Sequence, residues 1–253
     1  MNAIELFRKD TTKARFAEVL GERAPQFVVS VLSLINSNEQ LKACDPETIY
    51  GAAMTAAALD LPVNPNLGYA YIIPYGNQAQ FQIGYKGLIQ LALRSGQYRS
   101  INTTDVREGE IESFDRLTGE IRFKWLPDDE RVKAKVIGYA SHIELLNGFR
   151  STLYMSVAEV KEHANRYSKM AKRNQGIWTT DFDAMAKKTV LKLNLSRYGI
   201  LTVQMAKAIE SDQAVISNDR VVYVDNEPQV DEAAKEAASR ISSLFDEQNK
   251  NNQ

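Results

Sequence analysis

The sequence predicts an α+β fold, in which a single domain packs a small antiparallel, hairpin-rich sheet against several helices and is followed by a mobile C-terminal tail. Apolar residues recur at helical spacing towards both ends of the domain, which indicates the helices. In the middle of the chain, polar and apolar residues alternate between turn signals, which is typical of antiparallel strands. From residue 211 onward the sequence is acidic and ends in a low-complexity stretch, so we expect no packed core there.

The N-terminal part of the chain is predicted to be helical. Apolar residues recur at helical spacing over 4–20 and again over 24–36. A third helix begins after Asp45, whose side chain suits an N-cap, with Pro46 in the first turn. This helix runs through a stretch of small residues, 51–58, that lets another backbone approach closely. Two prolines shortly after it force extended chain.

The middle of the chain is predicted to form hairpins. A strand over 68–74 and a return strand over 79–83 flank a turn, and a short helix over 85–93 follows. Further along, Asn147 and Gly148 form a strong hairpin signal between two strands. The remaining predicted strands cover 98–106, 110–115, 120–126, 132–146 and 149–155.

Three helices are expected to close the domain. Ser156 and Glu159 form a capping box that opens a helix over 157–168. A second helix covers 181–197 and a third covers 202–211.

The composition shifts after the last of these helices. We therefore divide the chain into a domain over 1–210 and an acidic, flexible tail over 211–253. Within the tail, 233–245 has apolar residues at helical spacing and is expected to fold as a short amphipathic helix when a partner is present.

Composition places the protein among ordinary globular chains. It has 253 residues, with 31 Lys and Arg against 32 Asp and Glu, which excludes a disordered chain, a collagen-like fibre and a protein that binds nucleic acid through bulk positive charge. Cys44 is the only cysteine, so an internal disulfide framework is excluded. We find no secretory signal and no apolar stretch long enough to span a membrane, and we expect the protein in a reducing cytoplasm.

The motifs of common enzyme classes are missing. The sequence has no Gly-x-x-x-x-Gly-Lys-Ser/Thr phosphate loop and no Gly-x-Ser-x-Gly elbow, and it has only two histidines. The acids between residues 105 and 115 would suit a nuclease metal, but alternating Glu110 and Glu112 mark the solvent face of a strand more simply. We predict that the protein is not an enzyme and needs no cofactor or metal.

Charge is distributed unevenly along the chain. Residues 151–210 hold 10 basic and 5 acidic side chains, whereas residues 211–253 hold 4 basic and 9 acidic ones. A protein of formal net charge −1 therefore has a block of charge +5 and a tail of charge −5. Such a block is consistent with a surface for a polyanion or with an ordinary solvated helical face.

Two regions, 69–99 and 161–197, combine positive charge with aromatic rings. In the helix over 181–197, the apolar side is expected to face the core, while Lys187, Lys188 and Lys192 are expected to project together from the other side. A row of lysines suits a sugar-phosphate backbone, and rings beside it can stack on bases without reading their sequence. Each tyrosine taken singly is explained as well by a place in the sheet or core.

Four segments resemble one known family. They are 57–65 (AALDLPVNP), 68–75 (GYAYIIPY), 80–92 (QFQIGYKGLIQLA) and 184–192 (AMAKKTVLK). Together they resemble the RecT family of phage single-strand annealing proteins, over about residues 30–205.

The resemblance implies ATP-independent binding of single-stranded DNA and annealing of complementary strands in phage or prophage homologous recombination and repair. It also implies a homo-oligomer, as a ring or helical filament, and a partner 5′-to-3′ exonuclease in a bacterial host. The candidate DNA-binding residues are Lys86, Arg94, Lys187, Lys188 and Lys192 from the matching segments, Arg99, Arg107 and Arg197 from charge and position, and Tyr71, Tyr75, Tyr85 and Trp178 as candidate stacking rings.

Several alternatives remain open at this point. A passive single-strand DNA-binding protein would share the basic and aromatic regions but slow pairing, and a metal-dependent nuclease would need the clustered carboxylates. The helix segment 51–58 and the N-terminal helices are candidates for a subunit interface or simply for the core. The acidic tail suits contact with the exonuclease or with a host single-strand-binding protein, or it serves only for solubility.

Overall fold

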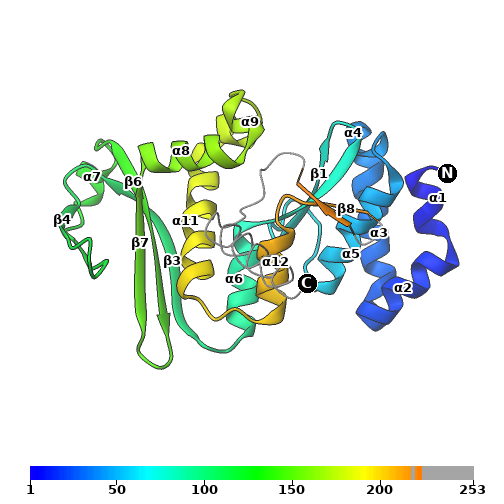
Figure 1. The fold of residues 1–253 in the computed structure, drawn as a ribbon, viewed down its shortest axis with the longest axis horizontal. Coiled ribbons are helices and arrows are strands. Elements are labelled where there is room, and N and C mark those ends of the chain that lie inside the picture. The colour runs from blue at the N-terminus through cyan, green and yellow to red at the C-terminus, as the bar shows by residue number, and fades with distance from the viewer. Residues whose placement is uncertain (218–219, 224–253) are drawn as a thin grey trace, which may run out of the picture.

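The computed structural model describes residues 1–217 and 220–223 and confirms the predicted α+β class, with helices packed around small antiparallel sheets (Figure 1). Helices gather at the N-terminal end and near the centre of the elongated chain, and the largest sheet stands towards the opposite end. Within the described part of the chain, no helix is both long and apolar enough to cross a membrane.

Short helices build the N-terminal end. The single helix expected over 4–20 is two helices, because the backbone of Lys9 is extended (φ −62°, ψ 138°) and Asn2 forms a capping box with Glu5 at the start of the first. Phe7 and Phe16 stack across this break, with ring centroids 5.8 Å apart. The elements are α1 (Ala3–Arg8), α2 (Asp10–Leu20), the 3-10 turn η1 (Gly21–Arg23), α3 (Ala24–Ser37), α4 (Glu39–Lys42) and α5 (Pro46–Ala58).

The small-residue stretch of α5 packs within this chain. Ala52, Ala53 and Ala56 are fully buried. A Cβ on Gly51 would lie 1.9 Å from the carbonyl oxygen of Ile216, so only glycine permits this approach. The face is therefore occupied intramolecularly, which corrects the idea that 51–58 offers a subunit interface.

A hairpin and one helix follow. Strands β1 (Ala70–Tyr75) and β2 (Gln78–Ile83) pair antiparallel, and α6 (Tyr85–Arg94) begins directly after them. Cβ atoms on Gly84 and Gly87 would come within 2.1 Å of the carbonyl oxygens of residues 68 and 69. These two glycines therefore let the start of α6 pack closely against the backbone that leads into β1.

The three-stranded sheet has the order β3-β6-β7, with β3 (Tyr98–Arg107), β6 (Val136–Leu145) and β7 (Arg150–Ser156) all antiparallel. Helices α8 (Val157–Tyr167) and α11 (Phe182–Tyr198) pack against it. On α11, the Asn194 side chain donates to the Ser141 carbonyl oxygen (2.9 Å) and accepts from the Ser151 hydroxyl (2.9 Å). These bonds fix α11 against the sheet.

Between β3 and β6 the chain forms a separate inserted segment. It contains the hairpin β4 (Ile111–Phe114) and β5 (Ile121–Phe123) and the short helix α7 (Asp128–Arg131). The strand expected over 120–126 is shorter, and the strand expected to start at 132 starts at Val136 because α7 precedes it.

The packed chain continues past residue 210, where the sequence suggested a boundary. The remaining elements are α9 (Lys169–Lys172), α10 (Ile177–Thr180), α12 (Val203–Ser211), β8 (Val215–Ser217) and β9 (Arg220–Val222). Asp212, Ala214 and Val215 are buried. The predicted short helix over 233–245 lies outside the described residues.

Candidate nucleic-acid interface

Helix α11 carries the lysines that the sequence placed in one exposed row. It is well anchored at its start, where the Asp181 carboxylate accepts from the Ala184 backbone amide at 3.1 Å. The three lysines do not project together. The Lys188 side chain is 9% exposed and that of Lys192 is 20% exposed, whereas Lys187 points towards Asp105, with 3.7 Å between its ammonium and the carboxylate.

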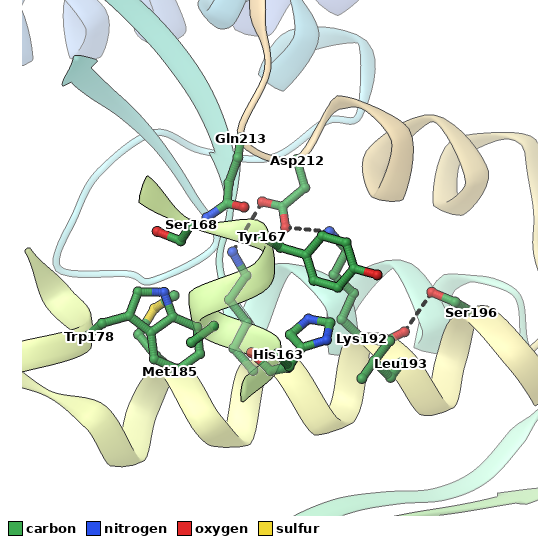
Figure 2. A pocket seen from close by; sticks show the side chains of 13 residues that line it. His163, Tyr167, Ser168, Trp178, Met185, Lys192, Leu193, Ser196, Asp212 and Gln213 are labelled. Atoms are coloured by element: carbon green, nitrogen blue, oxygen red, sulfur yellow. Dashed lines mark hydrogen bonds and ion pairs between the residues drawn. The ribbon is translucent and has the colours of Figure 1, made fainter. Parts of the chain in front are cut away.

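Lys188 and Lys192, one turn apart on α11, share one carboxylate (Figure 2). The Lys188 ammonium donates to one oxygen of Asp212 at 3.1 Å, and that of Lys192 donates to the other at 2.8 Å. Asp212 also accepts from the Ile83 backbone amide at 3.0 Å. The carboxylate therefore joins α11 to the end of β2, which brings two of the family-like segments together.

The chain around Asp212 is fixed as well. The Gln213 amide donates to the Phe81 carbonyl oxygen (2.8 Å), and the Phe81 amide donates to the Ala214 carbonyl oxygen (2.9 Å). These bonds lay residues 213–214 along the edge of β2. This role of Asp212 could not be predicted from the sequence, because Asp212 falls in the expected tail and no local pattern links it to α11.

The charges of this cluster do not cancel. Burial opposes ionisation of Asp212, but Lys188 and Lys192 outweigh it and hold the pKa of the carboxyl below its ordinary value. Burial lowers the pKa of Lys188, although Asp212 raises it. Two cations on one carboxylate leave one positive charge in the cluster.

A small cavity of about 50 Å³ opens beside this cluster. Its wall includes the His163 and Tyr167 rings of α8 and Trp178, all visible in Figure 2. Burial, followed by the charges of Lys192 and Arg166, lowers the pKa of His163 to about 4. The imidazole is therefore neutral at neutral pH and adds no charge to the site.

Helices α8 and α9 present exposed cations above this cavity. Lys161 lies over the Phe182 ring, 5.8 Å from its centroid, and Arg166 lies over the Tyr167 ring at 5.4 Å. Lys172 and Arg173, at the end of α9, are exposed. We call the side chains Lys161, Arg166, Lys172 and Arg173 the exposed basic surface.

Trp178, a candidate stacking ring, is half-buried at the edge of this surface. It packs against Phe182, with ring centroids 5.9 Å apart, and against the small core around Tyr139 and Val190. One side of the indole is therefore committed to the protein.

In the segments 68–75 and 80–92, which resemble the family, one candidate cation, Lys86, lies beside one candidate ring, Tyr71. Lys86 is exposed on α6, and its stem and the Tyr71 hydroxyl both lie about 3.5 Å from the position of a Cβ on Gly68. Tyr75 and Tyr85 are half-buried, and Tyr85 packs against the main core.

Arg94 is engaged elsewhere. Its guanidinium donates to the carbonyl oxygens of Leu59 and Asp60, both at 2.8 Å, and so satisfies the end of α5.

Three further candidates differ in their contacts and exposure. Arg99 pairs with Glu144 at 3.1 Å and is 58% exposed. Arg107 is 23% exposed and bonds to Asp105 at 2.9 Å and to the Ala134 carbonyl oxygen. Arg197 is exposed near the end of α11. The structure thus separates cations that reach solvent from cations bound within the fold.

The acids that suggested a nuclease metal are engaged with arginines. Asp105 pairs with Arg107 and Arg131. Glu110 was expected on the solvent face of a strand, but it is fully buried, because its carboxylate pairs with Arg131 at 2.9 Å. In residues 1–217 and 220–223, no group of three or more His, Cys, Asp or Glu side chains is placed to hold a metal ion.

Comparison with known proteins gives concordant results. The model of the family described as "RecT family" matches residues 25–231. The chain is 47% identical over 239 residues to "Uncharacterized protein YqaK" of Bacillus subtilis (strain 168), covering 92% of this chain and 82% of that protein. It is 30% identical over 178 residues to "Protein RecT" of Escherichia coli (strain K12), covering 67% of this chain but less than two thirds, 64%, of that protein.

Proposed function

Because this chain belongs to the RecT family, we propose that it binds single-stranded DNA and anneals complementary strands as an oligomer, without nucleotide hydrolysis. Family membership supports a recombination and annealing protein in general. The finer proposal of ATP-independent pairing is supported by a sequence without a phosphate loop.

One observation carries the proposed DNA contact: the exposed basic surface of α8 and α9 lies beside half-buried rings. Phosphates of one strand would contact Lys161, Arg166, Lys172 and Arg173. Bases of the same strand would stack on the exposed parts of the Tyr167 and Trp178 rings.

The other candidate residues divide by their contacts. Exposed Lys86, Arg99 and Arg197 would extend the path of the DNA backbone across α6, β3 and α11, and Lys187, whose ammonium lies 3.7 Å from Asp105, would contribute less. Lys188, Lys192, Arg94 and Arg107 bind carboxylates or carbonyls of the protein, and we assign them a positioning role.

Such a surface accelerates pairing by a simple physical route. Cations hold the backbone of the first strand, reduce its repulsion of the second strand and leave base edges free. Watson–Crick bonds and stacking then select the correct register, so the protein needs no sequence readout. Weak contacts in each subunit add up along an oligomer.

Two partners belong to the proposal. A 5′-to-3′ exonuclease would supply the single strand, and a host single-strand-binding protein would hand it over, with both contacted by the acidic tail. In this account, deletion of 224–253 spares annealing of bare oligonucleotides and removes only partner-dependent stimulation.

The test mixes two complementary labelled oligonucleotides with the protein, without nucleotide cofactor, and follows pairing by energy transfer. Pairing faster than the protein-free control, with strands of intact length, is expected. A passive single-strand binder would slow pairing, and a nuclease would shorten the strands when Mg²⁺ is added. Either result would contradict annealing.

A further inference from the structure

The β4–β5 hairpin ends in an exposed apolar tip. We call residues 111–123 the finger. At its tip Leu117 is 94% exposed, and Phe114 beside it is 41% exposed, with its ring edge-to-face with Tyr154 of the same chain (centroids 6.4 Å apart). A leucine so fully in solvent on an ordered turn contributes nothing to the stability of its own fold.

Ion pairs hold the base of the finger firmly. Arg131 binds the buried Glu110 carboxylate at 2.9 Å and Asp105 at 3.1 Å. Backbone bonds from Glu108 to the Lys135 carbonyl oxygen and from Lys124 to the Glu110 carbonyl oxygen, both 2.9 Å, tie the inserted segment to β6 and to itself. The tip is therefore presented in one orientation.

The tip carries negative charge around its leucine. Asp115 accepts from the backbone amide of Leu117, which with the Thr118 amide lowers the pKa of its carboxyl. Glu112 and Glu120 are exposed on the same hairpin, against Arg116 on the turn and Arg122, whose guanidinium lies 3.7 Å from the Glu120 carboxylate, so one net negative charge remains on the finger. Acids around an apolar tip would repel DNA phosphates, so a protein surface suits the finger better.

An apolar groove lies on another part of the molecule, between α2–α3 and the segment 60–67, with α6 at its edge. Its volume is about 520 Å³. The apolar part of its lining is Leu20, Phe27, Leu61, Val63, Leu67 and Tyr69. Arg23 and Arg94 also line it, against one acid, Asp60, so its charge is opposite to that of the finger tip.

The finger and the groove cannot meet within one chain. The finger stands at one end of the long axis, and α2 and α3, which form a wall of the groove, stand at the other (Figure 1). We infer that Leu117 and Phe114 of one copy insert into this groove of a second copy, with the tip acids facing Arg23 and Arg94. This rests on the oligomer proposed above and assigns its interface.

The geometry sets the kind of oligomer. Because two different surfaces meet, the contact is heterologous, and a pair of copies keeps one unused finger, on one copy, and one unused groove, on the other. Copies then add head to tail into an open filament or, if the rotation closes, a ring.

Two surface variants test the contact. Leu117→Asp removes the finger tip and Leu67→Asp spoils the exposed rim of the groove, while Val203→Asp, at a residue 87% exposed elsewhere, is the matched control. Size is measured by analytical ultracentrifugation without DNA and on poly(dT), with circular dichroism to verify folding. Each test variant should weaken self-association at least about 30-fold, as expected for loss of a central apolar anchor, and the control should not.

Mixing the two variants gives the sharpest result. Leu117→Asp retains a groove and Leu67→Asp retains a finger, so the mixture should form a dimer of one copy of each and nothing longer. A mixture that remains monomeric, a wild type that is monomeric on poly(dT), or a Leu117→Asp protein that assembles normally would overturn the interface. Annealing of oligonucleotides is measured separately: a Leu117→Asp protein that assembles normally and still anneals overturns the interface but leaves the proposed function intact.

Discussion

Two sets of cations, close together in the fold, have opposite surroundings. Lys188 and Lys192 lie beneath α8 and share the Asp212 carboxylate, whereas Lys172 and Arg173 extend into solvent from α9. All four belong to the same basic block of the sequence. A block of positive charge in a sequence therefore indicates a surface for a polyanion only where no carboxylate of the protein pairs with those cations in the fold.

The largest effect on stability is expected from changing Asp212, the carboxylate that pairs with the two buried lysines. Asp212→Asn leaves two buried ammonium groups without a counter-charge and should lower the free energy of unfolding by about 3–5 kcal/mol. Urea denaturation measures it. In the matched control, Asp10→Asn removes an exposed carboxylate, 3.2 Å from the Lys13 ammonium, and should cost under about 0.5 kcal/mol. Equal effects of the two changes would mean that Asp212 does not hold the lysines.

The next effect concerns pH. His163 faces Lys192, Arg166 and the Tyr167 ring, and its pKa is about 4 in the folded protein against an ordinary 6.5. Between these values the unfolded chain binds the extra proton, so the free energy of unfolding should fall as pH drops from 6.5 to 4, by about 2 kcal/mol. His163→Gln should remove that part of the pH dependence in urea titrations. If the free energy of unfolding of the variant depends on pH as that of the wild type does, then the pKa of His163 is not lowered in the folded protein.

A smaller effect tests the exposed set. Lys172→Glu with Arg173→Glu should leave the melting temperature unchanged and weaken binding of a poly(dT) oligonucleotide about tenfold or more, because phosphate contacts become repulsive. Fluorescence anisotropy measures it. Wild-type affinity in this folded variant would place the DNA on another face.

The smallest effect is expected on α6. Lys86→Gln removes one exposed cation beside Tyr71 and should weaken the same binding only two- to threefold, without loss of stability. Tyr71→Phe is the matched control and should change neither quantity. A drop as large as that of the α9 double variant would move the main DNA path to α6.

Local sequence signals predicted most of the fold. The capping box of Ser156 with Glu159 and the Asn147–Gly148 turn lie where expected, because caps and tight turns depend on neighbours in sequence. The break at Lys9 and the short helix α7 were missed, since both depend on contacts between distant residues: Phe7 stacks on Phe16 across the break, and Arg131 of α7 binds Asp105 and Glu110.

The residues that could bind DNA were less predictable, because their exposure also depends on contacts with distant parts of the chain. Helical spacing placed Lys188 and Lys192 on the polar side of α11, yet whether that side meets solvent depends on Asp212, which arrives from beyond α12. The likeness of four short segments to a family drew attention to the right elements. It did not distinguish cations that reach solvent from those that bind the protein.

In the proposed complex the exposed cations, and not the buried pair, contact the DNA. The most direct measurement is the slope of log affinity for poly(dT) against log salt, in Lys188→Met and in Lys172→Glu with Arg173→Glu. Lys188→Met leaves Asp212 balanced by Lys192, so the account predicts an unchanged slope, whereas the double variant should lose about 1.4 from it, about 0.7 for each phosphate contact. A folded Lys188→Met protein that loses slope, beside a double variant that keeps it, would contradict the account.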